Sequence, residues 1–108
     1  MDVHVAPGEP PRLTGVDDLQ SFSVIAAAGR DAAPTLAAEL DGVMQFEGTA
    51  HAWVSVNWLI ETSGHADSTE WRARFDAMTA YAARKGWTRA DPPAIRGHVV
   101  WQDRQAPE

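Results

Sequence analysis

Apolar and polar residues alternate along three stretches of the chain, the pattern expected of half-buried strands. The stretches are residues 20–28, residues 43–61 and residues 94–101. The middle stretch is interrupted by Gly48 and the residues that follow it, which can form a turn. The sequence therefore predicts four strands, two of them paired as a hairpin of residues 43–49 and 52–61.

A helical repeat occupies residues 68–85, between the hairpin and the last strand. Asp67 and Glu70 match a capping box, and Ser68 is an alternative N-terminal cap. Gly86 is a natural stop. The repeat places four apolar residues on one stripe of the helix, namely Trp71, Phe75, Met78 and Ala82. We expect this stripe to face the core.

The remaining segments have weaker patterns. Residues 1–13 hold three prolines, which resist both helix and central strand, and they predict a flexible N-terminal arm. Residues 32–40 contain helix-forming residues with Pro34 near the start, so a short helix is expected there. A strand or an irregular loop remains the alternative for residues 31–42. Residues 103–108 are expected to be a flexible tail, which leaves residues 14–102 as a single α+β domain.

The order strand, helix, strand, strand, helix, strand is that of a ferredoxin-like βαββαβ fold. In this fold, a four-stranded antiparallel sheet carries both helices on one face, and the first strand lies between the third and the fourth. The other face of the sheet is open. The expected open face displays Ser23, Ile25, Trp53, Ser55, Asn57, Leu59, Arg96, His98 and Val100.

Composition narrows the class of protein. The 108 residues suit one domain, and 15 acidic against 9 basic residues give a net charge of −6, which repels phosphate backbones and anionic lipid surfaces. We therefore expect neither nucleic acid nor membrane as a partner. A basic protein partner would suit this charge, although dispersed acids are more often a device for solubility. The absence of cysteine and of an apolar N-terminal run favours a cytoplasmic protein.

Candidate chemistry is sparse. Arg96 and His98 lie two apart on one strand face, and Asn57 is expected nearby, so these three are the candidate catalytic residues, with His98 as acid or base. No metal is expected, since the histidines and Asp67 have no recognised ligand spacing. No cofactor is expected either, because Gly29 lacks the further glycines of a phosphate-binding loop.

The expected open face is too apolar to be fully solvated, because it combines Trp53, Leu59, Ile25 and Val100. A partner molecule covers it, or another part of the chain folds over it. Trp87 lies outside the predicted helix and is a further candidate for contact with a partner or a pocket rim.

Two functions fit this picture. The first is a small, acidic, non-enzymatic domain of a regulatory or immunity type, which forms a homodimer or binds a protein partner through the open face. The alternative is a dimeric α+β barrel enzyme, or a binding protein without turnover, for a small apolar or aromatic metabolite and without a metal. A cavity of at least about 300 Å³ lined by tryptophan and capped by His98 would favour the alternative. A flat, filled face would favour the first function.

Overall fold

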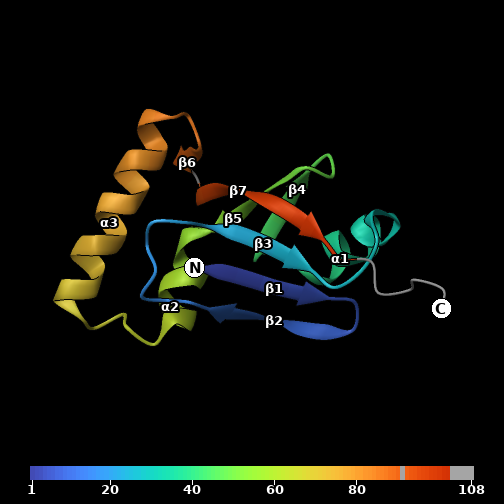
Figure 1. Ribbon diagram of the computed structural model, residues 1–108, viewed down its shortest axis with the longest axis horizontal. Coiled ribbons are helices and arrows are strands. Elements are labelled where there is room, and N and C mark those ends of the chain that lie inside the picture. Colours follow the sequence, from blue (N-terminus) through green and yellow to red (C-terminus); the bar gives the residue numbers. More distant parts are fainter. Residues whose placement is uncertain (91, 103–108) are drawn as a thin grey trace.

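The computed structural model describes residues 1–90 and 92–102, and the predicted tail of residues 103–108 lies outside them. Within the described residues, seven strands form one curled, mixed sheet in the order β2-β1-β3-β7-β5-β4, and β6 pairs with β7 outside this path (Figure 1). The elements in chain order are β1 (Asp2–Ala6), β2 (Glu9–Thr14), β3 (Ser23–Ala26), the 3-10 helix η1 (Arg30–Ala32), α1 (Ala33–Glu39), β4 (Met44–Glu47), β5 (His51–Ser55), α2 (Val56–Ser63), α3 (Thr69–Arg84), β6 (Thr88–Ala90) and β7 (Pro93–Trp101).

The ferredoxin-like arrangement expected from the sequence is wrong. β3 pairs in parallel with both β1 and β7, whereas a four-stranded antiparallel sheet contains no parallel ladder. The last strand β7 lies between β3 and β5, whereas the first predicted strand, now β3, was expected between the third and the fourth. The predicted hairpin is present as β4 and β5, which pair antiparallel. The fold is α+β, with a larger and mixed sheet.

The N-terminal residues form a hairpin of β1 and β2 where the sequence predicted a flexible arm. Val3 and Val5 alternate along β1 and are buried in the core. Pro10 and Pro11 lie in β2, the edge strand of the sheet. A proline cannot donate a ladder hydrogen bond, but one side of an edge strand needs no donor. The prolines are therefore compatible with this strand, and they do not release the segment from the sheet.

The predicted long strand of residues 52–61 divides into β5 and α2 at Ser55. The Ser55 hydroxyl accepts a hydrogen bond from the backbone N–H of Trp58 at 3.1 Å, which caps the first turn of the helix. Gly64 ends the helix in the left-handed conformation, with φ of 79°. Leu59 is buried on the core side of α2. Residues 56–61 are rich in strand-forming residues, yet they form a helix that begins at the cap of Ser55.

The second predicted helix is confirmed as α3. The Ser68 hydroxyl accepts from the backbone N–H of Trp71 at 3.1 Å, so Ser68 is the N-cap. Trp71 and Phe75 are buried and their rings stack, with centroids 5.0 Å apart. The short helix expected at residues 32–40 is also present, as α1, with Pro34 in its first turn.

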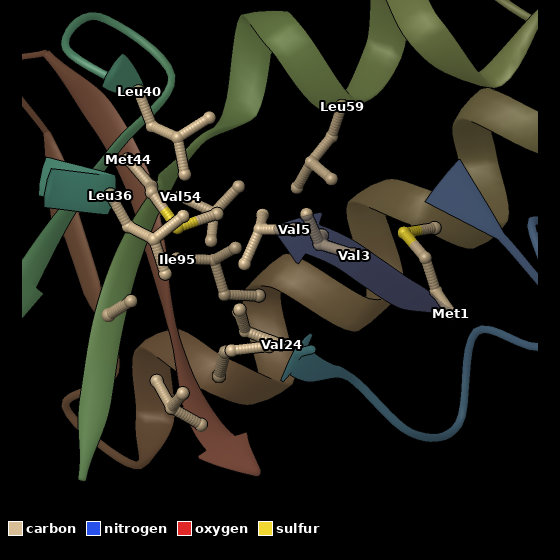
Figure 2. Close-up of a cluster of buried hydrophobic side chains, with 14 of the residues drawn as sticks. Met1, Val3, Val5, Val24, Leu36, Leu40, Met44, Val54, Leu59 and Ile95 are labelled. Carbon is tan, nitrogen blue, oxygen red and sulfur yellow. The ribbon is translucent and has the colours of Figure 1, made fainter. Parts of the chain in front are cut away.

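The core lies between the sheet and the helices α1 and α2. Figure 2 shows valines of β1, β3 and β5 meeting Leu59 of α2, with Leu36 of α1 and Leu40 packed at the other end of the cluster. Helix α3 stands beside the sheet, next to β6, and adds Trp71 and Phe75 to the same cluster (Figure 1). The opposite face of the sheet, here called the outer face, carries the alternate residues of each strand.

Gly97 allows β7 to pass beneath an aromatic ring. A Cβ atom at this position would lie 2.7 Å from Cε2 of Phe22, closer than side-chain atoms approach in folded proteins. We predict that Gly97→Ala lowers the free energy of unfolding by about 1–3 kcal/mol through overpacking. In a Phe22→Ala background the same substitution should cost less than half as much, as measured by urea denaturation. Equal losses in both backgrounds would contradict this explanation.

Candidate functional site

The outer face groups several of the residues singled out from the sequence. Strand register sets Ile25 of β3 opposite Val100 of β7, and Ser23 opposite His98. On the other side of β7, His51 of β5 lies opposite His98 and Trp53 lies opposite Arg96. Because residues opposite each other share a face, these side chains form a continuous surface across β3, β7 and β5.

A cleft of about 770 Å³ opens where this surface meets α3 and the loop that precedes β3. One wall is α3, the second is the loop, and the floor is formed by β7 with β5 beside it. The lining residues are Asp17, Asp18, Leu19, Gln20, Ser21, Phe22, His51, Arg74, Ala77, Met78, Tyr81, Ala82, Trp87, Ile95, Arg96 and His98.

The loop wall is held in place from α3. The indole Nε1–H of Trp71 donates to the backbone carbonyl of Val16 at 2.8 Å. One turn further along, Nη2 of Arg74 donates to the carbonyl of Asp17 at 2.6 Å. The terminal ammonium of Met1 donates to the carbonyl of Asp18 at 2.7 Å from the side of β1. Three hydrogen bonds to consecutive carbonyls therefore fix the position of the loop relative to both helix and sheet.

The helix wall becomes more exposed toward its C-terminal end. Trp71 is 3% exposed, whereas Tyr81 is 50% exposed. Trp87, which follows the helix, is 39% exposed, and its ring meets that of Tyr81 edge to face at 6.4 Å. The backbone N–H of Arg96 donates to the carbonyl of Trp87 at 2.8 Å, which ties this residue to β7. The cleft therefore has an aromatic rim and an apolar interior that includes Met78.

The floor of the cleft carries an arginine and two histidines. The rings of His51 and His98 meet edge to face, with centroids 5.7 Å apart. Arg96 lies two residues from His98 on the same face of β7, and its Nη1 lies 3.3 Å from Oε1 of Glu47 on β4. Imidazole and guanidinium groups are hydrogen-bond donors, and a guanidinium presents its donors as a planar fork. This end of the cleft is suited to bind a group rich in acceptors.

The structure places the predicted site residues in three regions: the cleft, the outer face beyond it, and helix α2. Arg96, His98 and Trp87 line the cleft together. Ile25 and Val100 lie on the outer face beyond it, and Val100 is 40% exposed.

Trp53 also lies on the outer face, but away from the cleft. The guanidinium of Arg89 stacks over its ring at 4.2 Å, beside a second hollow of about 550 Å³.

Asn57 and Leu59 were expected on the open sheet face and do not lie there. Both belong to α2, because the chain leaves the sheet after Ser55. Asn57 is exposed, and Leu59 is fully buried in the core. Asn57 therefore does not join His98 and Arg96, and Leu59 stabilises the fold instead of contributing to a surface.

Sequence reasoning missed several residues of the cleft. His51 was assigned to a turn, and its position opposite His98 follows only from the register between β5 and β7. Arg74 and Tyr81 were not singled out from the sequence, yet both line the cleft. A signal did exist for Tyr81, since a large aromatic residue lies beside the apolar stripe of the helix and six residues before Trp87.

Two further properties bear on the class of protein. Among residues 1–90 and 92–102, no group of three or more His, Cys, Asp or Glu side chains is placed to hold a metal ion. Helices of the described chain all fall short of the length and apolar character needed to cross a membrane.

No family model, curated protein or solved structure matches this chain. The cleft is therefore interpreted from its own residues.

Trp71 links the core to the loop wall, so we predict two effects of Trp71→Phe. The ring stays in the core, but the hydrogen bond to Val16 is lost, which should lower the free energy of unfolding by about 1 kcal/mol. Amide hydrogen exchange in residues 15–18 should become faster. Trp101→Phe is the matched control, because it removes an indole hydrogen bond of 2.7 Å to the carbonyl of Thr49. Faster exchange of the loop in both variants would contradict a specific role for Trp71.

Proposed function

We propose that this protein binds a small organic molecule with a flat, apolar body in the cleft between α3 and β7. The observation that carries the proposal is the cleft itself, about 770 Å³ in volume, with Trp87 at its rim and His98 in its floor. Pockets for small ligands usually have volumes of about 300–1,000 Å³, apolar walls and a few polar groups that fix orientation. The cleft has each of these properties.

The aromatic rim supports a flat ligand. Tyr81 and Trp87 are large side chains that remain substantially exposed. Burying such rings against another flat apolar group is favourable, and offset or edge-to-face pairs add about 0.5–1.5 kcal/mol beyond the area buried. Met78 lies deeper in the cleft, and its flexible thioether side chain adapts to ligands of differing shape.

We propose binding without turnover. A general base is usually held by a further group that orients its imidazole. In the described part of the chain, neither His51 nor His98 has a side-chain hydrogen bond that would orient its ring. The two rings contact each other edge to face instead. The histidines are therefore assigned to orienting a ligand.

A side chain that fills the cleft should abolish binding. Ala77 is exposed and lines the cleft from α3, so we predict that Ala77→Trp weakens binding of a neutral aromatic probe, indole, at least tenfold. Ala83→Trp is the control, since Ala83 is exposed on the same helix away from the cleft. Binding is measured by ligand-observed NMR, and thermal unfolding confirms that both variants fold. Equal binding of indole to both variants and the wild type would exclude the cleft as its site.

A second candidate function is self-association through the outer face. The observation in its favour is that Ile25 and Val100 lie directly opposite each other on β3 and β7, with Val100 exposed. Adjacent apolar side chains on an uncovered sheet face are typical of an interface between copies of a chain.

For this candidate we predict that the wild type is a dimer and that Val100→Asp is a folded monomer, because a charge buried at an interface is costly. Light scattering gives the mass and circular dichroism confirms the fold. Ala83→Asp adds the same charge on an exposed position of α3 and should leave the dimer intact. A monomeric wild type at high concentration would exclude this candidate.

A further inference from the structure

We infer that the ligand ends in an oxyanion, a carboxylate or a phosphate ester, which is held by His51, Arg96 and His98 at the floor of the cleft. This inference rests on the proposed function and adds the chemical class of the ligand. An apolar body would lie against Met78 and Trp87, and the anionic end would face β7 and β5. The ligand class is therefore a flat, amphiphilic acid.

Strand geometry brings the three basic side chains together. Residues 96 and 98 lie on one face of β7 because side chains alternate along a strand. His51 lies directly opposite His98 on the neighbouring strand, with ring centroids 5.7 Å apart. All three residues line the cleft. Since each belongs to a paired strand, their backbones are fixed before a ligand arrives, which reduces the entropy cost of binding.

Hydrogen-bond donors outnumber carboxylates at the floor. Arg96 carries a guanidinium, and His51 and His98 carry imidazole rings, against one carboxylate, Glu47. With the histidines neutral, as they are counted in the net charge of −6, the charges of Arg96 and Glu47 cancel. An oxyanion would therefore be held chiefly by hydrogen-bond donors.

The carboxylates of the loop wall are occupied by partners within the loop and the helix region. Oδ1 of Asp18 accepts from the backbone N–H of Gln20 at 3.2 Å, and Oδ2 accepts from the hydroxyl of Ser21 at 3.2 Å. Oδ1 of Asp17 lies 3.9 Å from Nε2 of His65. These contacts orient the two carboxylates within the loop, but both keep their charge at the wall of the cleft. The anionic end of the ligand would therefore lie at the floor and not against this wall.

Glu47 is the internal competitor of the ligand. Its contact with Arg96 is 3.3 Å long, and the two side chains are 50% and 30% exposed. An exposed ion pair of this kind contributes little to stability. A guanidinium has five N–H donors and binds an oxyanion through two of them in parallel, so a bound ligand can replace or join Glu47 at Arg96.

A series of matched probes tests the inference. 3-Phenylpropanoate, 3-phenylpropan-1-ol and 3-phenylpropylamine share one apolar body and end in an anion, a neutral group and a cation. We expect the propanoate to bind at least tenfold more tightly than the alcohol and the amine to bind most weakly, as measured by NMR titration of the wild type. Phenyl phosphate in the same titration distinguishes a phosphate ligand from a carboxylate.

Variants locate the preference for an anion. Arg96→Gln should reduce the advantage of the propanoate over the alcohol to less than threefold. Glu47→Gln should increase the affinity for the propanoate, because it removes the competing carboxylate. Arg12→Gln is the matched control, since it removes the same charge from an exposed position of β2 that does not line the cleft.

The outcomes separate the two proposals. If alcohol and propanoate bind the wild type equally, or if Arg12→Gln lowers the advantage of the propanoate as much as Arg96→Gln does, the assignment of an oxyanion is wrong and the cleft remains a site for neutral ligands. If none of the probes binds, the proposed function is wrong as well. Thermal unfolding of each variant shows that the comparison is made between folded proteins.

Discussion

The fold depends on β7, which must pair with three other strands at once. Its backbone bonds to β5 along one edge, and its other edge is shared by β6 near the start of the strand and β3 near the end. Arg96 and Gly97 lie between these two partners on the shared edge. The peptide of Arg96 is bound there by the carbonyl of Trp87, and Phe22 covers Gly97. The floor of the cleft therefore lies around the part of β7 that pairs with neither β6 nor β3.

Helix α3 explains why a cleft exists beside this strand. Its first half is anchored by Trp71 and Phe75, which reach the core and stack on each other. Toward its end the same side of the helix carries Met78 and then Tyr81, and the side chains become progressively more exposed. Ala82 still belongs to the core there, but the neighbouring Met78 and Tyr81 line an open space. One helix therefore contributes side chains to the core and also forms one wall of the cleft.

The sequence predicted the elements whose signals are local. The stripe that begins at Trp71 suffices to define α3, whose cap is Ser68, the alternative to the capping box of Asp67, and alternation suffices to define β7. It also predicted that His98 and Arg96 share a face with Ile25. The prediction was wrong where the local structure of a segment depended on contacts with residues distant in the sequence or on a single side-chain cap. Proline in β2 is acceptable only because that strand is an edge, and Ser55 ends a strand because its hydroxyl caps α2. His51 joins the site through register, which no local pattern specifies.

The shared edge of β7 has a consequence for the evolution of this fold. Ile95 and Val99 belong to the core, whereas Arg96 and His98 belong to the cleft, and the two sets alternate along one strand. An insertion or deletion of one residue inside β7 would exchange the sets, placing an arginine and a histidine in the core. The turn at Gly8 joins β1 to β2, away from β7, whereas the turn after Gly48 is bonded to Val99 through the carbonyl of Ala50 and to Trp101 through that of Thr49. Changes of chain length are therefore better tolerated at Gly8 than at Gly48. Substitutions at outer-face positions of β7, in contrast, alter the floor of the cleft without entering the core.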